Sequence, residues 1–126
     1  MKRREEESPD KNVRQKDVEI WKISCRLASC LKQIADEIDD PTFTEVLSRM
    51  REWAVTLPDQ ITTFVLLEDE TRYNLTRQDL RERVAENLYL VNYLSTEGYI
   101  KRPLYDSTIG FLSIIQGYLH TATFHP

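Results

Sequence analysis

The sequence contains few of the residues that interrupt regular structure or build special sites. It has 3 Gly and 5 Pro among 126 residues, so long regular elements are expected rather than many turns. No stretch reaches the ~18 apolar residues of a membrane-spanning helix. Neither sign of charge dominates, because 17 basic residues stand against 21 acidic ones, for a net charge of −4. This balance gives no reason to expect nucleic acid or an anionic membrane surface as a partner.

Reactive side chains are equally scarce. Cys25 and Cys30 lie about 140° apart on a helix at about 100° per residue, so they are not expected to pair. We expect reduced thiols and a cytoplasmic protein. His120 and His125 follow no metal-site spacing and have no nucleophile nearby in the sequence. We therefore expect no catalytic residue, no metal and no cofactor, and a protein that is not an enzyme.

The length suggests one domain, and the hydrophobic periodicity predicts an all-α fold. Residues 1–16 are almost entirely polar, lack the apolar core of a signal peptide, and are predicted to form a disordered tail. Residues 17–126 are predicted to form a single helical bundle of about five helices. The first of them should run over residues 17–40 and end at Pro41, which cannot continue a helix.

The next segments predict two helices separated by a proline. A capping box, Thr42 to Glu45, indicates the start of the second helix, in which the threonine hydroxyl and the glutamate carboxylate would satisfy free amides. That helix is predicted to stop near Leu57-Pro58. The apolar run "ITTFVLL" that follows has no strand to pair with, so it is predicted to form a short helix over residues 61–67.

Two further helices complete the prediction. "EDETRYN" reads as a polar loop over residues 68–74, and a helix is expected from Thr76 to about Thr96, with Gly98 as its stop. The last helix, over residues 106–121, includes "IGFLSIIQGYL", which is apolar round most of its circumference. Such a helix is typically buried in the middle of a bundle.

The first helix carries a clean apolar stripe. At about 100° per residue, its stripe residues fall within about 40° of Leu27, whereas Asp36 lies about 180° away. These residues are Ile20, Ile23, Leu31, Ile34 and Ile38. A stripe of this kind is explained fully by packing in the protein's own core. That packing does not explain the order "IADEI" over residues 34–38, where a small residue and an acid follow an apolar anchor.

That order resembles the third Bcl-2 homology motif, the death motif of the Bcl-2 family of apoptosis regulators. The motif has four apolar anchors, a small residue after the third, and then an aspartate. Its positions are filled here by Leu27, Leu31, Ile34, Ala35, Asp36 and Ile38, with Ile23 extending the stripe. The resemblance implies a Bcl-2-like bundle and helix-in-groove binding to Bcl-2-family partners, in which the aspartate pairs with a groove arginine. The layout of the chain is nearest that of Bid-like and Bax-like members.

The resemblance also implies a pro-apoptotic role, and conditional recruitment to the mitochondrial outer membrane without a transmembrane span. One alternative is a pro-survival, groove-bearing relative, of cellular or viral origin, that captures the death motifs of other proteins. The groove-forming members carry an Asn-Trp-Gly-Arg motif, and the nearest segment here, residues 97–107, keeps only a glycine and an arginine from it. The other alternative is an unrelated helical scaffold or oligomerisation domain. If the stripe is both core and ligand, the helix must leave the bundle before it binds.

Overall fold

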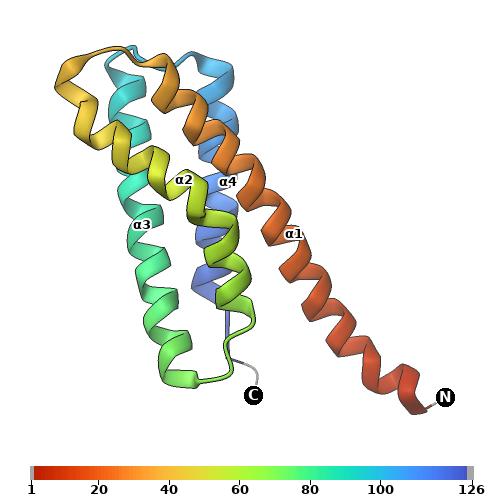
Figure 1. The fold of residues 1–126 in the computed structure, drawn as a ribbon. Coiled ribbons are helices and arrows are strands. Elements are labelled where there is room, and N and C mark those ends of the chain that lie inside the picture. Colours follow the sequence, from red (N-terminus) through yellow and green to blue (C-terminus); the bar gives the residue numbers. More distant parts are fainter. Residues whose placement is uncertain (1, 125–126) are drawn as a thin grey trace.

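The protein is a four-helix bundle, described from a computed structural model over residues 2–124, with side chains described over residues 15–124 (Figure 1). The helices run alternately up and down the bundle, as short connections between long helices require. They are α1 (Lys2–Glu37), the short 3-10 helix η1 (Pro41–Phe43), α2 (Thr44–Val65), α3 (Glu70–Thr96) and α4 (Arg102–Thr121). The predicted all-α class is confirmed.

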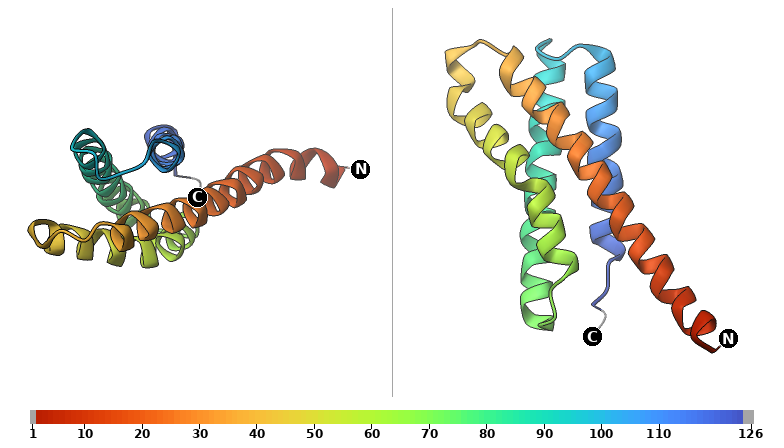
Figure 2. Two further views of the ribbon diagram at one scale, coloured as in Figure 1. Left: turned by 90° about the horizontal axis from the view of Figure 1, so that it is seen from above. Right: turned by 45° about the vertical axis from the view of Figure 1, so that its right-hand side comes forward.

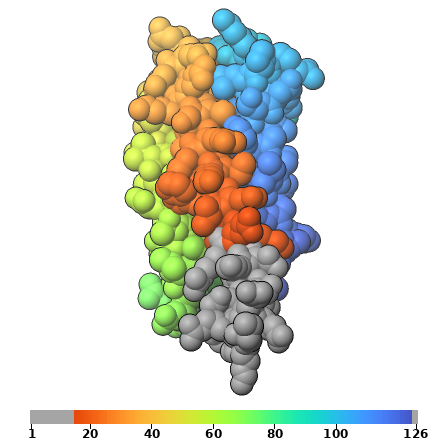
Figure 3. Space-filling view, turned by 90° about the vertical axis from the view of Figure 1, so that its right-hand side faces the viewer, coloured from red at the N-terminus to blue at the C-terminus, as the bar shows by residue number. Residues whose placement is uncertain are grey.

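The helices form two layers. Viewed along the bundle, α1 and α2 make one layer and α3 and α4 the other (Figure 2). Helix α1 also packs against α4, whereas α2 meets α3 much less extensively. Helix α1 therefore lies over the seam between α2 and α4, where the space-filling view shows it from outside (Figure 3). Its position makes α1 one wall of the hydrophobic core.

The prediction of about five helices is wrong because α2 continues through its proline. Pro58 lies inside α2, and the expected short helix over residues 61–67 is the last part of this helix, which ends at Val65. An internal proline costs a helix about 3 kcal/mol. Leu57, Ile61 and Phe64 are each fully buried, and each contributes about 1.5–3 kcal/mol when burial is complete. Their burial on one continuous face outweighs the local cost of the proline.

Three expected helix starts also differ from the structure. Helix α1 begins at Lys2, well before Asp17, in a segment rich in good helix formers. The disordered tail predicted for residues 1–16 falls mainly on residues whose side chains lie outside the described part, and it stays a prediction. Helix α3 begins at Glu70 inside the expected loop, because Asp69 accepts hydrogen bonds from the amides of Thr71 and Arg72 at 2.8 and 3.2 Å. Helix α4 begins at Arg102 rather than at Asp106.

The last helix is not buried on all sides. Helix α4 buries one face, on which Leu112, Ile115 and Leu119 are fully inaccessible, while Ile114 is 49% exposed. A four-helix bundle has no central helix, so each of its helices keeps a side toward solvent. The predicted end of α3 is confirmed: the helix ends at Thr96, and Gly98 adopts a φ of 85°, which favours glycine.

Candidate partner-binding helix

The predicted anchors form one face of α1 that points into the core. Leu27 and Leu31 are fully buried and Ile34 is 1% exposed, while Ala35 and Ile38 are buried beside them. Ile23 is half-buried and packs against the same core, and Asp36 lies on the exposed side of the helix. The structure thus brings the anchors together on one face. In the closed bundle that face contacts the chain's own helices.

Asp36 has a partner within the chain, which the sequence did not reveal. The Arg51 guanidinium of α2 lies 3.0 Å from the Asp36 carboxylate and donates from Nε to Oδ1 at 3.1 Å. The same guanidinium donates from Nη2 to the Ala35 carbonyl at 3.1 Å. Carbonyls in the last turn of a helix lack intrahelical donors and favour positive charge. The last turn of α1 contains no basic residue of its own, so Arg51 supplies that charge.

The end of α1 is tied to the opposite layer. Asp40 accepts a hydrogen bond from the Thr42 amide at 3.0 Å and another from the Tyr99 hydroxyl at 2.6 Å. These two bonds, the hydroxyl first, hold the pKa of Asp40 below its usual value. The Phe43 ring meets the Tyr99 ring edge to face, with centroids 5.2 Å apart. The expected capping box is therefore wrong: Asp40 caps η1, and α2 begins at Thr44 without a side-chain cap.

A second polar tie holds α1 against α4 near the other end of the bundle. The Tyr118 hydroxyl donates to the Asp17 carboxylate at 2.9 Å. Burial first, and then the negative charge of Asp17, raise the pKa of Tyr118 far above its ordinary value. The ring of Tyr118 also packs edge to face against the ring of Phe64, so the same side chain makes both a hydrogen bond and an apolar contact. Helix α1 is thus held by a polar contact at Asp17, by another just past its C-terminal end at Asp40, and by apolar contacts between them.

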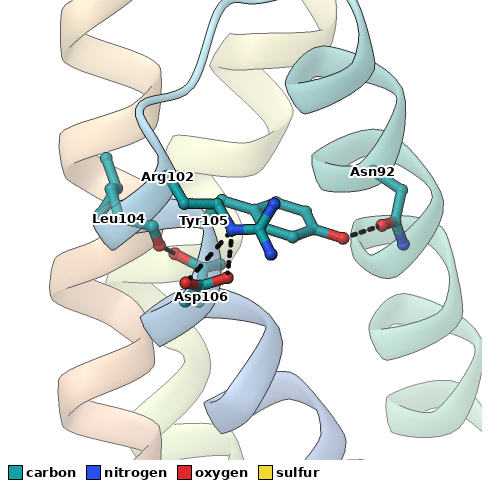
Figure 4. A network of polar contacts seen from close by, with 6 residues as sticks. Asn92, Arg102, Leu104, Tyr105 and Asp106 are labelled. Atoms are coloured by element: carbon teal, nitrogen blue, oxygen red, sulfur yellow. Dashed lines mark hydrogen bonds and ion pairs between the residues drawn. The ribbon is translucent and has the colours of Figure 1, made fainter.

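Helices α3 and α4 are also joined by side-chain contacts that do not involve α1. The Tyr105 hydroxyl donates to the Asn92 side chain across the two helices, and Arg102 lies 5.9 Å from the centre of the Tyr105 ring (Figure 4). Arg102 also pairs with Asp106 at 3.1 Å. All of these contacts join residues of α3 and α4. They would remain in place if α1 moved.

Residues able to hold a metal or to react are sparse. The described residues include no cluster of three or more potential metal ligands. Cys25 and Cys30 are both free, and burial raises the pKa of the Cys30 thiol above its ordinary value. Within the described part of the chain, no helix is both long enough and apolar enough to cross a bilayer.

Sequence reasoning identified the stripe but missed the residues that restrain it. Arg51, Asp17 and Tyr99 lie on other segments or outside the motif, and side chains far apart in sequence meet only through the fold. The one available signal was the lack of a basic residue in the last turn of α1, which leaves a place for a cation from elsewhere. Comparisons with protein-family models, curated proteins and solved structures gave no match.

Proposed function

We propose that the protein regulates apoptosis by presenting the death-motif face of α1 to the hydrophobic groove of a Bcl-2-family partner, and that it does so with α1 released from the bundle. The observation that carries the proposal is the placement of the whole motif on one helix. The four anchors Leu27, Leu31, Ile34 and Ile38 share a face, with Ala35 beside them and Asp36 pointing outward. An amphipathic helix of this pattern suits helix-in-groove recognition.

Release is required because one face cannot contact two partners at once. Each fully buried anchor contributes about 1.5–3 kcal/mol to the closed bundle. A partner groove would offer the same anchors a comparable apolar environment, so the two states compete. The apparent affinity of the intact protein is reduced by the fraction of molecules in which α1 is free. A pro-apoptotic role, a cytoplasmic location and recruitment to the mitochondrial outer membrane belong to the same proposal and rest on the resemblance.

A peptide titration tests the proposal most directly. A labelled peptide covering residues 18–41 is titrated into a purified pro-survival Bcl-2-family protein, beside peptides carrying Leu31→Glu or Asp36→Ala. We expect saturable binding of the native peptide, loss of binding for Leu31→Glu, and at least about tenfold weaker binding for Asp36→Ala, because a charge-assisted pair is lost. The intact protein should bind more weakly than the peptide.

The control and the opposing outcomes separate the alternatives. Lys32→Ala in the same peptide removes an exposed charge that lies outside the motif's positions, and it should leave binding unchanged. If the native peptide shows no saturable binding, the proposal is wrong. If the whole protein instead captures an established death-motif peptide, it is groove-bearing and the direction of recognition is reversed.

A further inference from the structure

Tyr99 occupies a position that none of the other tyrosines shares. All six tyrosines lie in the described part of the chain, and five of them belong to α3 or α4. Tyr99 lies in the connection between those helices, after the turn at Gly98, and is 39% exposed. Its neighbour Ile100 is buried and anchors the connection. Tyr99 is therefore presented outside any helix, on a short connection where its own amide donates to the Leu94 carbonyl of α3 at 2.9 Å.

The Tyr99 side chain joins two connections of the bundle. Its hydroxyl donates to Asp40 Oδ2 at 2.6 Å, and Asp40 Oδ1 accepts from the Thr42 amide. Its ring packs on Phe43 of η1. The α1–η1 junction and the α3–α4 connection lie at the same end of the bundle (Figure 1). Tyr99 therefore links the place where α1 ends to the layer that does not contain α1.

The surroundings of this hydroxyl are acidic. The hydrogen bond to Asp40 raises the pKa of Tyr99 most, followed by burial and by the negative charges of Asp40 and Glu97. A phosphate ester carries a charge of about −1.5 to −2 at neutral pH. At the Tyr99 oxygen, it would replace a hydrogen-bond donor to Asp40 with a like charge. The contact would change from attraction to repulsion.

We propose that Tyr99 is a site of tyrosine phosphorylation, and that a phosphate there detaches the α1–η1 junction from the α3–α4 connection. A tyrosine kinase supplies the reaction with ATP as phosphoryl donor. The Tyr99 oxygen forms a bond to the γ-phosphorus, the bond from that phosphorus to the β–γ bridging oxygen breaks, and ADP leaves. The phenolic proton passes to the base of the kinase. Lys101, an exposed residue two positions after Tyr99, offers the new phosphate a cationic partner on the α3–α4 connection.

The modification deepens the proposed function, on which its consequence for partner binding rests. Ile38 lies at the end of α1, where its amide still bonds to the Ile34 carbonyl at 3.3 Å. A loosened junction exposes these two anchors first, because they are the ones nearest to Asp40. Phosphorylation would thus raise the fraction of molecules in which the motif is accessible. Loosening of the junction itself does not depend on any partner.

The experiment treats the whole protein with a broad-specificity tyrosine kinase and ATP, maps the modified residue by mass spectrometry, and measures amide hydrogen exchange. The reporters are the amides of Ile38 and Phe43, which bond to Ile34 and Asp40. We expect modification at Tyr99 and exchange about three- to tenfold faster at both amides. Tyr99→Phe should abolish this kinase effect. Tyr89→Phe is the matched control, since Tyr89 is 70% exposed but lies within α3.

Two results would overturn the inference. One is a native protein left unmodified at Tyr99 by a kinase that modifies an unstructured peptide of residues 94–104. The other is a protein modified at Tyr99 whose Ile38 and Phe43 amides exchange at the unmodified rate. Partner binding is assayed separately with the peptide of residues 18–41. A failure of the proposed function is therefore distinguishable from a failure of the Tyr99 site.

Discussion

Arg51 of α2 binds Asp36 of α1 and also the carbonyl of the residue before it, at 3.0 and 3.1 Å. Asp36 is therefore already paired inside the chain, with the residue type that a partner groove would offer it under the proposed function. Both side chains remain about half exposed, and exposed ion pairs contribute about 0–1 kcal/mol. Under the proposed function, Arg51 would thus compete with the partner for Asp36 without strongly stabilising the bundle. The buried anchors, rather than this pair, hold α1 in place.

Removing Arg51 should change partner binding more clearly than it changes stability. Arg51→Ala should lower the free energy of unfolding in urea by about 1 kcal/mol or less, because the pair is solvent-screened. It should raise the affinity of the intact protein for a pro-survival partner while the peptide of residues 18–41, which lacks Arg51, is unaffected. Arg49→Ala is the control, since Arg49 pairs with Glu86 of α3 and not with α1. Equal affinities for the Arg51→Ala and Arg49→Ala proteins would contradict a competing role.

Leu31 should be essential to the closed bundle. Leu31→Ala removes a fully buried side chain and should cost about 2–5 kcal/mol of unfolding free energy, measured by urea denaturation followed by circular dichroism. Leu75→Ala, at a leucine that is 63% exposed on α3, should stay within about 0.5 kcal/mol of the parent. If both variants lose the same amount, Leu31 is not packed as the structure shows.

Pro58 should lower the stability of α2 locally, because it lies inside the helix. Pro58→Ala restores an amide that can donate to the Ala54 carbonyl and removes the clash of the proline ring. The more flexible unfolded chain offsets part of the gain. We expect a net stabilisation of about 1–2 kcal/mol, visible as a higher urea midpoint. Val55→Ala, at an exposed site of the same helix, should give little change, and a destabilised Pro58→Ala protein would show that the proline is needed for the shape of α2.

The Asp40–Tyr99 contact should depend on pH in a defined direction. The pKa of Asp40 is lowered in the fold, so its contribution to stability is present above the ordinary value of 3.8 and is lost as pH falls below about 4. The pKa of Tyr99 is raised, so its contribution is present below 10.0 and is lost as pH rises through the folded value.

Carboxyl titration by NMR measures the Asp40 part of this prediction. In Tyr99→Phe, the pKa of Asp40 should move up toward 3.8, because the largest cause of its depression is removed. Tyr105→Phe is the matched control, since its hydroxyl binds Asn92 and not Asp40. An Asp40 pKa that is the same in the parent and in Tyr99→Phe would show that the two side chains are not in contact in solution.

Helices whose apolar residues recur at regular helical spacing were predictable from the sequence. The residues at which the helices begin and end were harder to predict. The stripe from Ile20 to Ile38 follows from spacing alone. The stop at Gly98 follows from the residue type, because the positive φ found there favours glycine. Pro58 misled the prediction because a local rule for helix interruption met a longer apolar face that runs through it. Asp69 was missed because it lies in a segment whose polarity resembles that of a loop.

The candidate site divides in the same way. The sequence by itself determined which residues share a face of α1 and that Asp36 points away from that face, because both follow from the helical period. Only the tertiary structure decided that the face is buried against α2 and α4, and that Asp36, Asp40 and Asp17 meet Arg51, Tyr99 and Tyr118. The physical reason is that periodicity fixes directions within one helix, whereas contacts between helices depend on how the helices are arranged in the bundle.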